Sequence, residues 1–126
     1  MKFDYASDYF PPIPVLLVFL GYPGDALRLG PVAAIIDTGA DGTIAPQILL
    51  DEIGAPLVDQ VRIRSQWGEW RTMQVFTIDL GLGELRLPAI EVVGDPGSEL
   101  VLGRNVLNDL RLMLDGPAGQ VTLEYH

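Results

Sequence analysis

Cysteine is absent from this chain of 126 residues, and histidine occurs once, as His126 at the end of the sequence. The absence of cysteine excludes disulfide bonds, thiol nucleophiles and cysteine metal sites. Because terminal residues are usually poorly ordered, His126 is a weak candidate for a catalytic triad or a metal ligand. The sequence therefore predicts neither a bound metal nor a cofactor.

Basic residues are also scarce, with 8 lysines and arginines against 17 acidic residues and a net charge of -9. A nucleic-acid-binding domain needs a basic surface, so this balance argues against a nucleic-acid partner. Apolar runs are short as well, and Val15–Leu20 is far below the roughly 20 residues of a membrane-spanning helix. Asp4 and Asp8 precede this run, where a signal peptide carries positive charge. We therefore expect a cytoplasmic protein without a membrane partner.

Glycine and proline are plentiful, with 14 and 10 residues, and 48% of the chain is hydrophobic. Many turn-forming residues between short apolar segments are typical of short strands, so the composition predicts mostly β structure. A chain of this length is expected to form one domain with a core of its own. We therefore treat residues 1–126 as a single predicted domain.

One stretch combines an apolar strand with chemically active side chains. Val32–Ile36 predicts a strand buried on both faces, and it leads directly into Asp37, Thr38 and Gly39. Burying an ionisable group such as Asp37 is costly unless the group is paired or used in catalysis. An alternative interpretation is an Asx-type turn, in which the Asp37 side chain only accepts hydrogen bonds from nearby backbone amides.

A second stretch, towards the C-terminal end, predicts a strand followed by a short helix. The strand covers Glu99–Leu102 and ends at Gly103. The apolar residues after it fall on one side of a helix, as expected for a buried stripe. They are Val106, Leu107 and Leu110.

Both stretches resemble the signature motifs of the aspartic peptidases, and in detail those of the retropepsins, the retroviral-type proteases. Ile35–Asp41, Ile-Ile-Asp-Thr-Gly-Ala-Asp, is similar to the active-site turn of that family. Val101–Asn105, Val-Leu-Gly-Arg-Asn before a helix, is similar to its second hallmark. The motifs occur in the family's order, and the resemblance covers roughly residues 13–114. It implies an all-β fold, a small closed barrel of the acid-protease type with a flap hairpin and one short C-terminal helix.

The resemblance also implies roles for the residues of the first motif. Asp37 would be the catalytic carboxylate, and the Thr38 hydroxyl would bond backbone of the opposite subunit. The Gly39 carbonyl would accept a hydrogen bond from substrate backbone. Ala40 and Asp41 would lie along the bound substrate.

The second motif is implied to support the first. In the family its glycine, here Gly103, lies behind the catalytic turn, and Asn105 belongs to the same support. Its arginine, here Arg104, pairs with the acid two residues after the catalytic glycine, which is Asp41. We expect this ion pair to be partly buried, so that breaking it from one side would cost roughly 3–5 kcal/mol.

Peptide hydrolysis by carboxylates needs two of them, because one activates water while the other, protonated, hydrogen-bonds the carbonyl oxygen. The chain contains one Asp-Thr-Gly sequence, at Asp37, so the second carboxylate would come from another copy. A two-fold homodimer places both copies of this residue at its axis. We therefore expect an aspartic endopeptidase that binds an extended peptide or protein substrate across both subunits. Two alternatives are a non-catalytic peptide-binding module and a dimerisation module of the same fold.

Residues 61–78 are the predicted flap, which is part of a longer hairpin. The strands of this hairpin are Val58–Gln66 and Trp70–Leu80. Between them, Gly68 and Glu69 fit a two-residue type II′ turn, which requires glycine at its first central position.

This turn would place Trp67 opposite Trp70 as a cross-strand aromatic pair. By family analogy, the tip residues Trp67, Gly68 and Glu69 would contact substrate. Retropepsin flaps are usually rich in glycine and lack two tryptophans, so this tip departs from the pattern. The alternative is an ordinary surface hairpin with a stabilising tryptophan pair.

The same register places Arg62, Arg64 and Arg71 on one face of the hairpin, with Arg71 opposite Gln66. One interpretation is a solvated outer face, which is what most charge clusters are. The other is a set of cations that pair with acidic residues of the substrate or of the partner chain.

The two ends of the chain complete the predicted domain. Residues 1–12 form an N-terminal extension, and Ile13–Leu20 predicts the first barrel strand. Residues 111–126 predict a C-terminal hairpin with strands Arg111–Leu114 and Gln120–Tyr125, which we expect to take part in the dimer interface.

Three further sites carry a prediction. Residues 45–54 fit a short helix, because Pro46 suits a first helical turn and Gly54 a helix end. Asp79 and Asp115 lie close to glycines but lack an adjacent threonine or serine. We interpret both as turn residues.

Overall fold

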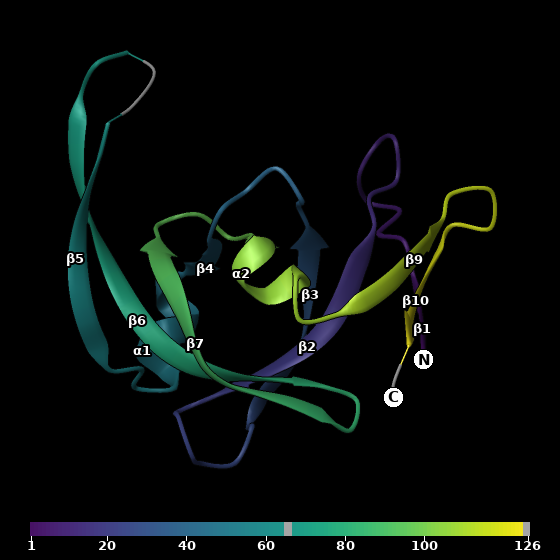
Figure 1. Ribbon diagram of the computed structural model, residues 1–126, viewed down its shortest axis with the longest axis horizontal. Coiled ribbons are helices and arrows are strands. Elements are labelled where there is room, and N and C mark those ends of the chain that lie inside the picture. Colours follow the sequence, from purple (N-terminus) through teal and green to yellow (C-terminus); the bar gives the residue numbers. More distant parts are fainter. Residues whose placement is uncertain (65–66, 125–126) are drawn as a thin grey trace.

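The computed structural model describes residues 1–64 and 67–124. Its main feature is a closed barrel, in which neighbouring strands pair around a ring (Figure 1). The ring closes because β2 pairs with β3 on one side and with β6 on the other. In their order around the barrel, the strands are β2 (Val15–Gly21), β3 (Leu29–Ile36), β8 (Leu100–Leu102), β4 (Thr43–Pro46), β7 (Leu85–Asp95) and β6 (Trp70–Leu82).

A separate three-stranded sheet lies beside the barrel and joins the two ends of the chain (Figure 1). Its order is β1 (Lys2–Asp4), β10 (Gln120–Glu124) and β9 (Arg111–Asp115). The predicted C-terminal hairpin is therefore present, while its last residues, Tyr125 and His126, lie outside the described residues. Val121 and Leu123 of β10 are buried in the core of the same chain.

Two short helices interrupt the β structure. α2 (Arg104–Leu107) is the helix that the resemblance implied near the C-terminal end. α1 (Gln47–Glu52) fulfils the separate prediction for residues 45–54, with Pro46 at its N-cap and Gly54 at a φ of +64° shortly after its end. Within the described residues, neither helix has the length and apolar character needed to cross a lipid bilayer.

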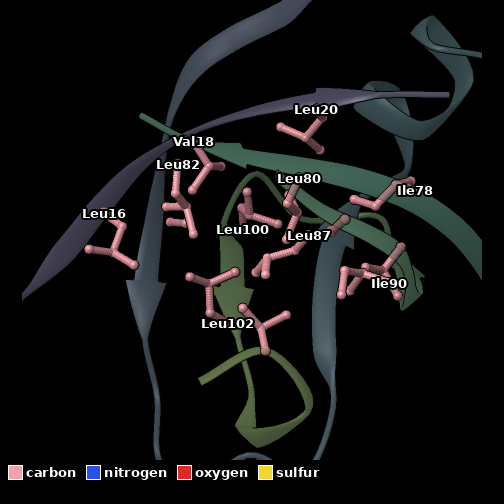
Figure 2. Close-up of a cluster of buried hydrophobic side chains, with 14 of the residues drawn as sticks. Leu16, Val18, Leu20, Ile78, Leu80, Leu82, Leu87, Ile90, Leu100 and Leu102 are labelled. Atoms are coloured by element: carbon pink, nitrogen blue, oxygen red, sulfur yellow. The ribbon is translucent and has the colours of Figure 1, made fainter. Parts of the chain in front are cut away.

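Side-chain alternation along the barrel strands explains the core. Ile78, Leu80 and Leu82 of β6 point inward at every second position and are fully buried in the cluster of Figure 2. In β3, Ala34 is buried while Ala33 is exposed. The prediction that this strand is buried on both faces is therefore wrong, because β3 lies in the barrel wall with one face to the interior and one outward.

The flap hairpin forms, but its predicted register is wrong. It pairs β5 (Leu57–Arg64) with β6, and Arg64 lies opposite Trp70. The predicted register would instead place Arg64 opposite Met73, so a two-residue turn at Gly68 and Glu69 does not join the strands. Trp67 lies in a turn, with 81% of its surface exposed, and does not face Trp70 across the strands.

The corrected register divides the three arginines of the hairpin between its two faces. Arg62 lies opposite Thr72, and Arg64 lies opposite Trp70, so these four residues share one face. Arg71 lies opposite Ile63 and therefore points to the other face. The prediction of three arginines on one face is wrong. Gln66, the partner predicted for Arg71, lies outside the described residues.

The prediction that Asp79 is a turn residue is also wrong. It lies within β6 and not in a turn, and the residue is 2% exposed. It pairs with Arg86, whose Nη2 lies 2.7 Å from Asp79 Oδ2. Asp115 meets its prediction, because its Oδ1 accepts a hydrogen bond from the Ala118 amide in the turn between β9 and β10.

Candidate active site

The loop of residues 37–42, which we call the Asp37 loop, connects β3 to β4 at one end of the barrel (Figure 1). The Asp37 amide donates to the Leu102 carbonyl of β8 at 3.1 Å, so the loop starts from a fixed point in the barrel wall. The Gly39 amide donates to Asp37 Oδ1 at 2.9 Å, and the Ala40 amide to the Asp37 carbonyl at 3.2 Å. One carboxylate oxygen is thus held by the turn itself.

Asp37 is exposed to solvent at this end of the barrel. Asp37, Thr38 and Gly39 are all exposed in the single chain. The Gly39 bond also fits the alternative of an Asx-type turn, because that turn needs only a local amide donor. Local geometry is therefore compatible with a catalytic carboxylate and with a structural one.

The second motif packs directly behind the Asp37 loop. A Cβ placed on Gly103 would lie 2.2 Å from the Gly42 carbonyl oxygen, so only glycine allows this approach. The Arg104 amide donates to the Ala40 carbonyl at 2.9 Å, and the Asn105 amide to the Asp41 carbonyl at 3.3 Å. The residues at the start of α2 thereby hold the far side of the loop, as the resemblance implied.

Thr43 links the two motifs from a fully buried position that the sequence reasoning missed. Its Oγ1 accepts from the Gly103 amide at 3.1 Å and donates to Asn105 Oδ1 at 2.8 Å. Asn105 Nδ2 in turn donates to the Glu91 carbonyl at 3.0 Å. The available signal was a threonine at the start of an apolar strand, because a buried hydroxyl needs partners.

Arg104 joins both ends of the Asp37 loop at the surface. Its guanidinium pairs with Asp41 and donates to the Thr38 carbonyl at 2.8 Å. The Arg104 and Asp41 side chains are 44% and 93% exposed. The ion pair therefore forms as implied, but the prediction that it is partly buried is wrong for the single chain, and water screens it.

This exposure changes what the pair contributes to stability. We expect Asp41→Asn to change the free energy of unfolding by about 0–1 kcal/mol, as for other surface pairs. Arg104→Ala should cost more, about 1–2 kcal/mol, because it also removes the bond to the Thr38 carbonyl. Thermal denaturation of both variants measures the difference. Equal and large losses in both would show that the pair is buried in solution, as it would be beneath a partner molecule.

A hollow of about 270 Å³ adjoins the Asp37 loop and has a mostly apolar lining. Its lining includes Ile36, Thr38, Leu107, Leu110, Leu112 and Leu114.

A second hollow, of about 470 Å³, lies against β4 and β8 and has no residue of the Asp37 loop in its lining, which includes Tyr9, Ile44, Glu99 and Val101. The Tyr9 hydroxyl donates to the Glu99 carboxylate, and this hydrogen bond raises the pKa of the phenol above its ordinary value. Among the described residues, no group of three or more histidine, cysteine, aspartate or glutamate side chains could hold a metal ion.

The structure brings together most of the residues that the sequence singled out. Residues 37–41 and 103–105 form one hydrogen-bonded unit. Trp67, Gly68 and Glu69 lie apart from it, at the far end of the β5–β6 hairpin. Figure 1 shows the hairpin and the Asp37 loop projecting from the same end of the barrel, with the hairpin tip well away from the loop.

Comparisons with known proteins concern the fold. No protein-family model matches the chain, and no curated protein matches it either. Among solved structures, a retropepsin-like aspartic protease from Rickettsia conorii is 15% identical, with a TM-score of 0.68 over 99% of this chain and 88% of that one. The EIAV protease bound to the inhibitor HBY-793 is 15% identical, with a TM-score of 0.59 over 77% and 86%.

A third match covers most of both chains. The retroviral protease-like domain of Ddi1 from Leishmania major is 18% identical, with a TM-score of 0.54 over 89% of this chain and 90% of that one. Likeness at such identities shows a shared fold. The predicted all-β, closed-barrel fold class is thereby confirmed, with α1 in addition to the C-terminal helix.

Proposed function

We propose that this chain, which has the retropepsin-like fold, is an aspartic endopeptidase in which Asp37 supplies half of a catalytic dyad. The observation that carries the proposal is the Asp37 loop. An exposed carboxylate is oriented by the Gly39 amide, and the loop is braced from behind by Gly103 and Arg104. A reacting carboxylate has to be held in one orientation, whereas a surface turn without a function does not need the supporting contacts of Gly103 and Arg104.

The chemistry requires a second carboxylate close to the first. Two carboxyl groups about 3 Å apart cannot both ionise, so they share one proton. The ionised member takes a proton from water, and the protonated member hydrogen-bonds the carbonyl oxygen of the peptide. Each chain offers one Asp37, so a two-fold homodimer would bring the pair together at its axis.

Each residue of the loop then has a distinct task. The Gly39 amide would hold Oδ1 of Asp37, leaving Oδ2 to face water and substrate. Arg104 would fix the Thr38 carbonyl, so that the Thr38 hydroxyl is aimed at the partner chain. The Gly39 carbonyl would accept a hydrogen bond from substrate backbone bound in an extended form.

An apolar surface beside Thr38 suits the dimer contact. Leu112 and Leu114 line the hollow next to Thr38, and 49% of Leu114 is exposed. Deleting residues 120–126 is a poor test of this contact, because Val121 and Leu123 belong to the core of their own chain. A substitution on β9 avoids that difficulty.

We expect Leu114→Asp to weaken dimerisation by about tenfold or more, because a charge would be placed in an apolar contact. Met113→Asp is the matched control, since Met113 is 51% exposed on the same strand and points to the opposite face. Sedimentation over a concentration series measures both. A dimer constant that is unchanged in Leu114→Asp, or lowered equally in both variants, would contradict this placement of the interface.

The direct test of the proposed function is hydrolysis. Reduced and alkylated serum albumin, incubated with the protein at acidic and at neutral pH, should give discrete fragments, whose sequences identify the cleaved bonds. A statine inhibitor should stop the reaction, because its hydroxyl group occupies the position of the attacking water between the carboxylates. Chelators and serine-peptidase inhibitors should not stop it. Albumin that stays intact under all conditions would overturn the proposal.

A non-catalytic peptide-binding module is the second candidate. The observation that favours it is the hairpin tip, which lies away from the Asp37 loop in the single chain (Figure 1). Such a module would bind the albumin-derived peptides with measurable affinity and leave them intact. Binding and cleavage assays on the same peptides separate the two candidates.

A further inference from the structure

One face of the β5–β6 hairpin gathers two cations on an aromatic ring. The Arg62 guanidinium lies over the Trp70 ring at 4.9 Å from its centroid, and the Arg64 guanidinium at 6.0 Å. We call these three residues the cationic face. Cation–π stacking of this kind restricts the motion of the guanidinium groups and leaves their N–H edges available for hydrogen bonds to a ligand.

The strand register fixes the direction of the cationic face. Trp70 stands an even number of residues before Ile78 and Leu80, which point into the barrel, and β6 pairs without a bulge of its own from residue 70 to residue 78. Side chains two apart share a face, so the cationic face continues the inner face of the barrel beyond its rim. Figure 1 shows that the Asp37 loop projects from that same end.

The charge of the cationic face contrasts with the rest of the molecule. The protein carries a net charge of -9, so two adjacent arginines on an inward-looking surface stand out. Between described residues, the ion pairs are Arg86–Asp79 and Arg104–Asp41, and neither involves the cationic face. A planar guanidinium binds a carboxylate through two parallel hydrogen bonds, which makes an acidic side chain its natural ligand.

We infer that the cationic face selects acidic side chains in the peptide substrate. The inference rests on the proposed function, because it assumes that an extended peptide lies between the hairpin and the Asp37 loop. Successive side chains of an extended peptide point to opposite sides. The preference for glutamate or aspartate therefore falls on alternate substrate positions, those whose side chains face the hairpin.

The competing interpretation is a solvated outer surface with no role in recognition. The outer face of the hairpin carries Arg71, which lies opposite Ile63. Arg71 has the same charge on the same hairpin but points the other way. Arg71 is therefore the control that distinguishes direct contact of Arg62 and Arg64 with the substrate from a general effect of the positive charge on the hairpin.

The test uses a peptide that spans a bond cleaved in serum albumin. A series of synthetic variants carries glutamate or glutamine at each position around that bond, and kcat/KM is measured for every peptide. For the wild type, we expect glutamate to be preferred by about fivefold at alternate positions, the scale of one or two surface ion pairs. The preference should disappear in Arg62→Gln/Arg64→Gln and persist in Arg71→Gln. It should also shrink as salt is raised, since salt screens exposed charges.

The outcomes separate this inference from the proposed function. If the wild type cleaves the neutral peptides but shows no glutamate preference, the inference is overturned and the proposed function stands. An equal loss of preference in Arg71→Gln and in the double variant also overturns it, because the effect then belongs to overall charge. If no peptide is cleaved by the wild type, the proposed function fails and the inference falls with it.

Discussion

Asp37→Asn should lower kcat by about 10³-fold or more, because both carboxylates of the proposed dyad become amides that cannot take a proton from water. The fold should be retained, since the asparagine oxygen can still accept the hydrogen bond that the Gly39 amide donates to Asp37 Oδ1. Albumin cleavage and thermal denaturation, measured on the same preparation, check both parts of this prediction.

Asp25→Asn is the control for the change of charge, because Asp25 is an exposed aspartate in the turn between β2 and β3. It should leave kcat unchanged. Mixing tests the shared dyad itself: an excess of Asp37→Asn chains, added to the wild type, should suppress activity as mixed dimers form. Full activity in Asp37→Asn, or no suppression on mixing, would contradict a dyad built from two copies.

The Asp37 loop and its support could be predicted because residues 35–41 and 101–105 resemble the two signature motifs of the retropepsins. Gly103 has no room for a side chain against Gly42, and the amides of Arg104 and Asn105 donate to the Ala40 and Asp41 carbonyls of the loop. These contacts join segments about 60 residues apart, which the pairing of β4 with β8 brings together. The relation of Arg104 to Asp41 was likewise implied by two motifs alone.

The hairpin register could not be predicted in the same way. Gly68 and Glu69 fit a two-residue turn locally, yet Arg64 lies opposite Trp70, three residues out of the register that this turn requires. Register depends on the whole pairing of the strands, including the irregularity between Leu57 and Asp59. A shift of register moves side chains to the other face, which is why Arg71 was assigned to the wrong side.

Burial was the other property that the sequence did not reveal. The ion pair expected to be buried, Arg104–Asp41, lies at the surface, and the buried carboxylate belongs to Asp79. Two of its partners, Arg86 and Ala89, lie on the neighbouring strand β7, and the third comes from a distant part of the chain. Gly24, 55 residues away, reaches Asp79 through the turn after β2, which pairs with β6. The contact between Gly24 and Asp79 depends on closure of the barrel and cannot be predicted from a local sequence pattern.

The partners of Asp79 explain its electrostatics. Burial by itself would raise the pKa of this carboxyl, but the amides of Gly24 and Ala89 and the Arg86 guanidinium donate to it and together lower the pKa below its ordinary value. The donor distances to the carboxylate are 3.0 Å for Gly24, 2.8 Å for Ala89 and 2.7 Å for Arg86 Nη2. The carboxylate is therefore charged and fully engaged at neutral pH.

Asp79→Asn should accordingly lower the free energy of unfolding by about 3 kcal/mol or more at neutral pH, because it leaves Arg86 without its counter-charge and a buried amide beside donors. Asp41→Asn is the same chemical change in the exposed pair and should cost about 0–1 kcal/mol. Denaturant unfolding of both variants and the wild type measures the contrast. Equal losses in the two variants would show that the burial of Asp79 has no energetic consequence.

The pH dependence gives an independent check on the same carboxylate. A pKa that is lower in the folded than in the unfolded chain means that the charge stabilises the fold above the unfolded pKa, near 3.9 for aspartate. That contribution is lost as pH falls through the lowered folded-state pKa. The gap in unfolding free energy between wild type and Asp79→Asn should thus be constant from neutral pH down to about pH 5 and narrow below about pH 4. A gap that widens on acidification would mean that the folded state raises this pKa instead, with burial outweighing the three donors.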